Sequence, residues 1–192
     1  MARYGTTQRG GPLAAASDIE LAQAAADGDR AAFAELVRRA APLAWSTLRR
    51  MGAQPALADD LTQDTLLIAL RAIATYRGEA AFASWAARIA AREYLQHLRK
   101  NARLMLTAEP ADADTTADPT LAHGARLDLD KSLARLKPVE RLCVSLCHGA
   151  GFTHDEISAE LGIPLGTAKS HVTRGLKKLR LLMRAEEEET RT

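Results

Sequence analysis

Aromatic residues and long apolar runs are both scarce in this chain of 192 residues. Phe, Trp and Tyr make up only 4% of the sequence although 47% of it is hydrophobic, so alanine and leucine supply most of the apolar side chains. This composition favours helices over sheets, and we expect an all-α protein. The longest stretch without a charged residue runs from Leu142 to His154, short of the roughly 18 apolar residues of a membrane span. We therefore expect no transmembrane helix.

An excess of charge of one sign is also lacking, because 26 basic side chains face 24 acidic ones and the formal net charge is +2. Any affinity for nucleic acid must therefore come from how the charges are distributed along the chain. The apolar patch from Leu13 to Ala16 is too short for the core of a signal peptide. We interpret residues 1–16 as a disordered lead and expect a cytoplasmic protein.

Cysteine is rare as well, with Cys143 and Cys147 four residues apart and His148 beside them. A tetrahedral zinc site needs four ligands at recognisable spacing, and the sequence holds no second cluster of Cys or His. A metal site and a redox pair remain the alternatives to two small buried thiols on an apolar helix face, and we favour the buried thiols. We expect no metal and no cofactor.

The N-terminal part of the chain predicts a bundle of four helices over residues 17–100. Ser17 and Glu20 form a capping box at the start of the first helix. Gly52 ends the second helix, in which Pro42 is expected to introduce a kink or a split. The expected helices span about residues 17–27, 30–51, 55–75 and 80–100.

Residues 101–125 are rich in Ala, Asp, Thr and Pro and have no helical apolar periodicity, which is typical of a flexible acidic linker. A linker of this length spans on the order of 80 Å when extended, so the two domains need not touch. Residues 126–185 predict a second domain of four helices, and residues 186–192 an acidic tail.

The strongest pattern of the second domain is a helix-turn-helix from Thr153 to Met183. Thr153 and Glu156 form a second capping box, and Gly162 supplies the turn. Ala168, Val172 and Leu176 then follow at intervals of four residues on the inner face of a long helix. Such a motif presents the N-terminal half of its second helix to a DNA major groove. Its outward residues form hydrogen bonds readily: Thr167, Lys169, Ser170, His171, Thr173 and Arg174.

Charge is sorted between the two helices of this motif. The second carries six basic residues before Glu186, whereas the first carries Asp155, Glu156 and Glu160. A solvated face of an ordinary helical hairpin is the alternative, but such faces usually mix both signs. We expect Lys177 and Lys178 to contact phosphates. Base edges fall to Lys169, Ser170, His171 and Arg174.

Two further surfaces lie in the first domain. Arg88, Arg92 and Arg99 fall within roughly 40° of one another on the fourth helix, which makes either a basic stripe or a plain solvated face. The loop from Tyr76 to Glu79 adds an aromatic ring, a guanidinium and a flexible glycine that together suit an unpaired base. On the third helix a mostly polar face indicates either a protein-binding surface or a solvated face with one leucine: Asp60, Gln63, Asp64, Leu67 and Arg71.

The segments from Asp60 to Leu66, from Tyr76 to Ala90, from Leu136 to Arg141 and from Gly162 to His171 together resemble the extracytoplasmic-function sigma factors of bacterial RNA polymerase. The resemblance covers most of the chain after Ser17. It implies that the first domain binds the polymerase clamp and the melted minus-ten element, and that the second reads the minus-thirty-five element as duplex. It also implies an anti-sigma partner and a linker that threads through the polymerase.

Carried over by position, the resemblance assigns each surface a partner. Clamp contacts fall on Asp60, Gln63, Asp64 and Leu67, with Arg71 on the same face. Minus-ten contacts fall on Tyr76, Arg77, Gly78, Glu79, Arg88 and Arg92, with Arg99 on the same stripe. Minus-thirty-five contacts fall on Thr167, Lys169, Ser170, His171 and Arg174, with Thr173, Lys177 and Lys178 beside them. The chain departs from the family pattern at Leu70, where tryptophan is common, at Ala168, where valine is common, and at His171, where arginine is frequent. The first two are expected to affect packing and the third base preference.

Two other functions remain open on the sequence. An ordinary helix-turn-helix regulator with a helical sensing or dimerisation domain would form dimers on palindromic operators. An enzyme acting on nucleic acid would need a carboxylate cluster, a set of metal ligands or a paired nucleophile, none of which the sequence displays. We expect a transcription initiation factor that is not an enzyme.

Overall fold

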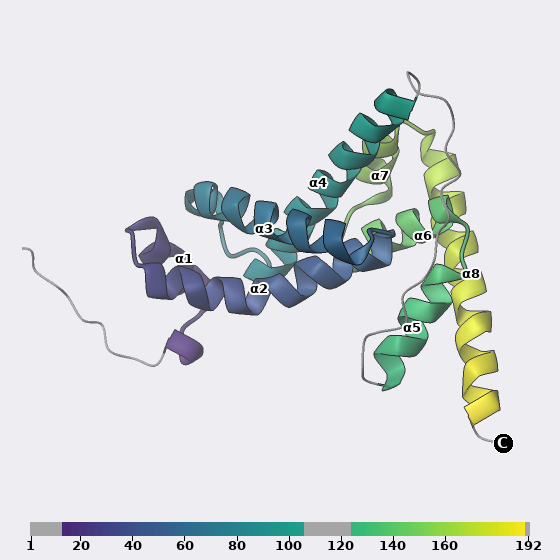
Figure 1. The fold of residues 1–192 in the computed structure, drawn as a ribbon, viewed down its shortest axis with the longest axis horizontal. Coiled ribbons are helices and arrows are strands. Elements are labelled where there is room, and N and C mark those ends of the chain that lie inside the picture. The colour runs from purple at the N-terminus through teal and green to yellow at the C-terminus, as the bar shows by residue number, and fades with distance from the viewer. Residues whose placement is uncertain (1–12, 106–123, 191–192) are drawn as a thin grey trace, which may run out of the picture.

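The computed structural model describes residues 13–105 and 124–190, and within these ranges the chain is helical with no strand. The all-α prediction is confirmed. In the N-terminal part, helices α1 (Asp18–Ala26), α2 (Arg30–Met51), α3 (Pro55–Arg71) and α4 (Phe82–Met105) form the bundle (Figure 1). The C-terminal part contains α5 (Gly124–Ala134), α6 (Pro138–Val144), α7 (His154–Leu161) and α8 (Leu165–Thr190). None of the described helices is long and apolar enough to cross a membrane.

Local sequence signals account for the helix limits in the bundle. The capping box of Ser17 and Glu20 is present, and Asp29 Oδ1 accepts hydrogen bonds from the first amides of α2. Gly52 ends α2 in the left-handed conformation, with φ of 117°. Pro42 lies inside α2 without splitting it.

The expected limits were wrong at three places. Residues 13–16 are ordered rather than part of a disordered lead, because Arg39 on α2 donates hydrogen bonds to the carbonyls of Leu13, Ala14 and Ala16. Helix α3 ends at Arg71 and is followed by a separate 3-10 turn, η2 (Ile73–Thr75). Helix α4 continues to Met105 and α5 already begins at Gly124, so residues 101–105 and 124–125 are not linker. The predicted lead before Leu13 and the predicted linker over 106–123 lie outside the described residues.

The C-terminal part is built around α8, against which α5, α6 and α7 all pack. Helix α6 starts at Pro138 and is prolonged by a π-helical turn, η3 (Ser145–Gly149). The second capping box, Thr153 with Glu156, opens α7, and Gly162 ends it with φ of 65°. The predicted helix-turn-helix geometry is therefore present.

The two parts of the chain share one apolar core. Met51, Tyr94 and Leu95 from the bundle pack in the same cluster as Leu146 and Phe152 from the C-terminal part. In Figure 1, α7 lies beside α4, and α6 lies beside the C-terminal end of α2. The sequence left open whether the domains touch, and in this structure they are closed on each other.

Polar contacts seal the same interface. Arg141 donates from Nε to the carbonyl of Arg50 at 2.7 Å and from Nη2 to the carbonyl of Arg49 at 2.6 Å. Ser145 Oγ also donates to Arg50 O, at 3.1 Å. The last carbonyls of a helix have no partner within the helix and carry partial negative charge, so a guanidinium suits this position. Arg141 thus caps α2 from the other half of the molecule.

Candidate nucleic-acid interface

The inner face of α8 holds the helix-turn-helix together. Ala168 is fully buried and Val172 is 3% exposed, as the spacing of four residues predicted. Ser158 Oγ donates to Ile163 O at 2.6 Å and fixes the turn between α7 and α8. The expectation that Ala168 concerns packing is confirmed, because its side chain lies in the shared core.

The opposite face of α8 is open to solvent. Lys169, Ser170, Thr173, Arg174 and Lys177 are exposed, whereas Thr167 and His171 are half-buried. These are hydrogen-bonding or cationic side chains at positions where a recognition helix meets DNA.

Arg174 already interacts along its own helix. Its Nε donates to Ser170 O at 3.2 Å, and its Nη2 lies 3.3 Å from Nδ1 of His171. The side chains of His171 and Arg174 therefore form one polar cluster. A change at either residue would alter the donors presented by the other.

Lys178 differs from its neighbours because its Nζ pairs with Glu140 Oε2 at 2.7 Å. Glu140 is 3% exposed, and the hydrogen bond from Lys178 holds the pKa of this carboxyl below its usual value. The sequence predicted a phosphate contact for Lys178, and the structure shows that its ammonium ties α8 to α6.

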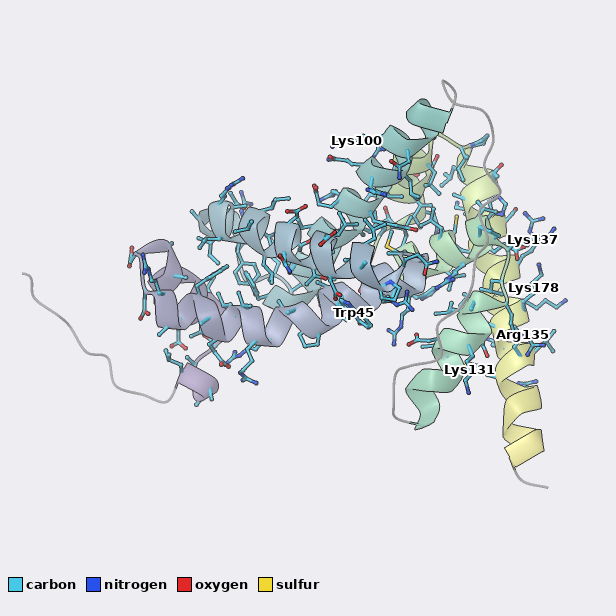
Figure 2. All side chains as sticks on the ribbon, in the orientation of Figure 1. Trp45, Lys100, Lys131, Arg135, Lys137 and Lys178 are labelled. Carbon is cyan, nitrogen blue, oxygen red and sulfur yellow. The ribbon has the colours of Figure 1, made fainter. Side chains whose placement is uncertain are left out.

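Sequence reasoning missed a second group of basic side chains. Lys131, Arg135 and Lys137 are exposed and, together with Lys178, lie on the side of the molecule formed by α5 and α8 (Figure 2). They come before the helix-turn-helix, so its spacing gave no sign of them. Their shared surface with α8 extends the positive charge beyond the recognition face.

The basic stripe of α4 faces α7, although the side chains of Arg92 and Arg99 remain 48% and 55% exposed. Arg88 pairs with Glu156 and donates from Nη1 to Gly151 O at 2.5 Å. Arg99 Nη2 lies 3.0 Å from Glu160 Oε2, and Arg92 Nε lies 3.6 Å from Glu160 Oε1.

An aromatic ring completes this contact. Phe152 is 2% exposed, with the guanidinium carbons of Arg88 and Arg92 at 4.5 and 5.4 Å from its ring centroid. Two arginines at this distance gain cation–π attraction in addition to the ion pairs. Two of the three acidic residues that the sequence placed on the first helix of the motif, Glu156 and Glu160, therefore have a specific partner, the stripe of α4.

Glu156 serves both the motif and the contact. Its Oε2 accepts from the backbone N–H of Thr153 at 2.8 Å, while its Oε1 accepts from Arg88. The bond from Thr153 is the main cause, and Arg88 the second favourable one, of a pKa below the usual value for this carboxyl.

The loop between η2 and α4 exposes Arg77, Gly78 and Glu79, but Tyr76 is 8% exposed. The Tyr76 ring packs edge-on against Phe82, with centroids 5.4 Å apart, and its hydroxyl donates to Ala80 O at 2.6 Å. The proposed stacking of Tyr76 on a base does not fit this placement. Tyr76 instead packs beneath the exposed loop residues, in the core of the bundle.

A cleft of about 640 Å³ opens between this loop and the C-terminal part. Its walls include Arg77, Trp85 and Arg88 on one side and His148 and Gly151 on the other. The cleft therefore exists only while the two halves are closed.

The polar face predicted on α3 is fully exposed, with Asp60, Gln63, Asp64, Leu67 and Arg71 all open to solvent. Leu67 is 53% exposed and Leu70 is 40% exposed, so the face carries two large apolar side chains rather than one. Leu70 was expected to affect packing, and its exposure shows that it is a surface residue. The face of α3 therefore presents two exposed leucines beside its carboxylates.

The cysteines match the expectation of buried thiols in part. Cys143 is fully buried, which raises its pKa to about 11, and half-buried Cys147 also has a raised pKa because of burial. Both thiols are thus protonated and unreactive near neutral pH. No group of His, Cys, Asp or Glu that could hold a metal ion occurs among the described residues.

Comparison with known proteins places this chain in a family. Residues 36–104 match the model of sigma-70 region 2, and residues 126–179 match that of sigma-70 region 4. RNA polymerase sigma factor CarQ of Myxococcus xanthus is 37% identical over 164 residues, which cover 82% of this chain and 92% of CarQ. ECF RNA polymerase sigma factor SigE of Mycolicibacterium smegmatis is 35% identical over 165 residues, 81% of this chain and 64% of SigE.

The fold agrees with these matches. The sigma factor RpoE from Bartonella quintana, solved in complex with the anti-sigma factor NepR, superposes with a TM-score of 0.59 at 23% identity. The superposition covers 79% of this chain and 96% of RpoE. The chain belongs to the extracytoplasmic-function family of RNA polymerase sigma factors, the transcription initiation factors that direct polymerase to promoters.

Proposed function

We propose that this sigma factor uses its three surfaces for three separate contacts. The exposed face of α3 binds the polymerase clamp through Asp60, Gln63, Asp64, Leu67 and Arg71. The loop residues Arg77, Gly78 and Glu79, with Arg88, Arg92 and Arg99 of α4, bind the melted minus-ten element. The exposed face of α8 reads the minus-thirty-five element through Thr167, Lys169, Ser170, His171, Thr173 and Arg174, with Lys177 on the phosphates.

The observation that carries this proposal is the different state of the two DNA surfaces. The recognition face of α8 is open, whereas the arginines of α4 are paired with Glu156 and Glu160. A nucleic-acid strand that binds Arg88, Arg92 and Arg99 must displace both carboxylates. Use of the minus-ten surface therefore requires the two halves, which we assign to residues 17–105 and 124–185, to separate.

The closed form also raises the question of which partner controls the protein. RpoE of Bartonella quintana is bound by an anti-sigma factor, and we propose that a partner of this kind also binds the present chain. As a subunit that acts with polymerase and carries no enzyme chemistry of its own, it would work in the cytoplasm, at the nucleoid during transcription.

Run-off transcription tests the proposal. Core RNA polymerase is incubated with this protein and a random-sequence DNA library, and the transcripts are mapped to their start sites. We expect transcripts that share sequence elements at two fixed distances upstream of the start. Absence of any promoter-specific transcript, together with absence of core binding, would overturn the proposal.

Variants at each surface separate the three contacts. Asp64→Ala is expected to weaken binding to core polymerase, whereas Lys169→Ala and Arg174→Ala should weaken promoter use and leave core binding intact. Equal loss of core binding in all three variants would contradict the assignment of surfaces.

A further inference from the structure

Asp18, the first residue of α1, lies between two distant parts of the bundle. Its Oδ2 accepts a hydrogen bond from the backbone N–H of Phe82 at 2.7 Å, and its Oδ1 accepts from Arg39 Nη1 at 2.9 Å. Phe82 is the first residue of α4 and follows directly on the loop assigned to the minus-ten element. Asp18 therefore caps α4 from outside that helix.

Ile19 continues the same contact beneath the loop. Gly78 has a φ of +74°, and a Cβ added there would lie 3.3 Å from Ile19 Cδ1. The loop backbone thus rests directly on the Ile19 side chain. Gly78 permits both this close approach and the left-handed conformation. The loop therefore packs on α1 at this position.

Arg39 fixes Asp18 in turn. Its guanidinium donates to Asp18 and also to the carbonyls of Leu13, Ala14 and Ala16, which holds the chain in front of α1. Glu35 on α2 also accepts from Arg39, at 2.8 Å from Nε, which is a different nitrogen from the one that donates to Asp18. Asp18 and Arg39 have side chains only 23% and 22% exposed, so water competes weakly for these bonds.

We infer that Asp18 is a positioning residue for promoter melting, because it holds the loop from Tyr76 to Ala81 in the shape that receives the unpaired minus-ten strand. It does not contact DNA itself. The loop is anchored at its start by the buried Tyr76, at its middle by Ile19 and at its end by the Asp18 bond to Phe82. With these ends fixed, Arg77 and Glu79 stay exposed in one arrangement, and little entropy is lost on binding.

This inference rests on the proposed role of the loop, and Asp18 lies outside the residues that match the region 2 model. The matched stretch begins at residue 36, so the first helix is a part of this chain to which that match assigns nothing. The structure joins this helix to the loop region through Asp18 at the Phe82 N–H and through Ile19 at Gly78, beside the core cluster that Leu21 shares with Tyr76.

Equilibrium binding of the holoenzyme tests the role of Asp18. The probe is the promoter that the wild-type holoenzyme selects from a random-sequence library, prepared as a fork with an unpaired minus-ten strand and as a duplex of the upstream element alone. Asp18→Ala is expected to weaken binding to the fork by at least about tenfold, the scale of one charge-assisted hydrogen bond. Binding to core polymerase and to the upstream duplex should be little changed.

Glu35→Ala is the matched control. It removes the other carboxylate from Arg39 but leaves the Asp18 bond to Phe82 in place, so binding to the fork should stay near the wild-type value. Thermal unfolding is measured for both variants. If the two variants lower fork binding equally, Asp18 acts only through the stability of the bundle, and the inference is overturned.

A double-variant cycle separates this inference from the proposed function. Arg77→Ala combined with Glu79→Ala must weaken fork binding by itself, and failure to do so would refute the minus-ten role of the loop. If that loop variant does weaken binding, adding Asp18→Ala should cause little further loss, because Asp18 acts through the loop. A full additive loss would overturn the positioning role. Ile19→Ala provides a second variant without a hydrogen bond and is expected to weaken fork binding in the same selective way.

Discussion

Glu140 is a carboxylate with 3% of its surface exposed, and it receives a hydrogen bond from Lys178 Nζ. A buried charge without a partner is costly, whereas the long lysine side chain covers apolar surface and brings its ammonium to the carboxylate. At the scale of single residues, basic character alone is therefore a poor guide to DNA contact. Lys177 is open to solvent, and Lys178, its direct neighbour, holds two helices together.

Lys178→Met is expected to lower the free energy of unfolding by about 1–2 kcal/mol. This is less than for a fully buried pair, because the Lys178 side chain is 45% exposed and solvent screens it. Urea denaturation measures the loss, and Lys177→Met is the control that should leave stability nearly unchanged. Unaltered stability of Lys178→Met would show that the ion pair contributes nothing.

The Glu140 pair also predicts an acid dependence. The folded-state pKa of Glu140 lies below the ordinary value of 4.5, so its contribution is complete above that value. The contribution is lost as pH falls through the lowered folded-state pKa. Unfolding free energies measured between pH 6 and pH 3 should therefore converge for wild-type and Lys178→Met at the acid end. A constant difference across this range would contradict the sign.

At the scale of elements, helix starts and turns followed from local chemistry, whereas helix ends followed less well. Capping boxes at Ser17 and Thr153 and the turn at Gly162 were predictable, because each depends on residues within one turn of the chain. The extension of α4 to Met105 was not, since no breaker residue marks it. The sequence also contained no sign that residues 13–16 are ordered, because they are held by Arg39, a residue more than 20 positions away.

The packing of α8 against α6 depends on Gly175, which has no side chain. A Cβ added there would lie 2.6 Å from Val144 Cγ2, so α6 and α8 approach each other closely. Alanine favours helix by about 1 kcal/mol over glycine, but overpacking costs about 1–3 kcal/mol. Gly175→Ala should therefore destabilise the protein, as measured by thermal unfolding.

Two control variants sharpen the Gly175 prediction. Gly166→Ala lies on the same helix with nothing within 4 Å of the added Cβ, so it should be neutral or slightly stabilising. Adding Val144→Ala to Gly175→Ala should recover part of the loss by removing the colliding methyl groups. If Gly166→Ala and Gly175→Ala have the same effect, steric contact with α6 is not the cause.

At the scale of the whole molecule, the closed arrangement of the two halves could not be predicted, because it depends on contacts between distant parts of the chain. The stripe of Arg88, Arg92 and Arg99 and the carboxylates Glu156 and Glu160 were each visible in the sequence. Their opposite charges were a usable signal, but nothing local shows that residues more than 60 positions apart in the chain meet. The exposed faces of α3 and α8 were predictable because each face is complete within one helix.

Separation of the two halves can be tested directly. Glu156→Gln combined with Glu160→Gln removes both negative charges from the arginine stripe, and glutamine still supports the capping box at Thr153. The free chain should then bind single-stranded DNA several-fold more tightly, as measured by fluorescence anisotropy at low salt. Asp155→Asn combined with Asp27→Asn is the control, because it also removes two negative charges, from exposed carboxylates outside these ion pairs. Equal gains for both proteins would mean that only net charge matters.

The two oxygens of Glu156 divide the work of this residue, since Oε2 closes the start of α7 and Oε1 receives Arg88. Losing the arginine leaves the helix start as it was, with its amide and hydroxyl bonds from Thr153 intact. Separation of the halves thus needs no refolding of the helix-turn-helix. If the halves separate as proposed, we expect the C-terminal half to move as one body with its helix-turn-helix already formed.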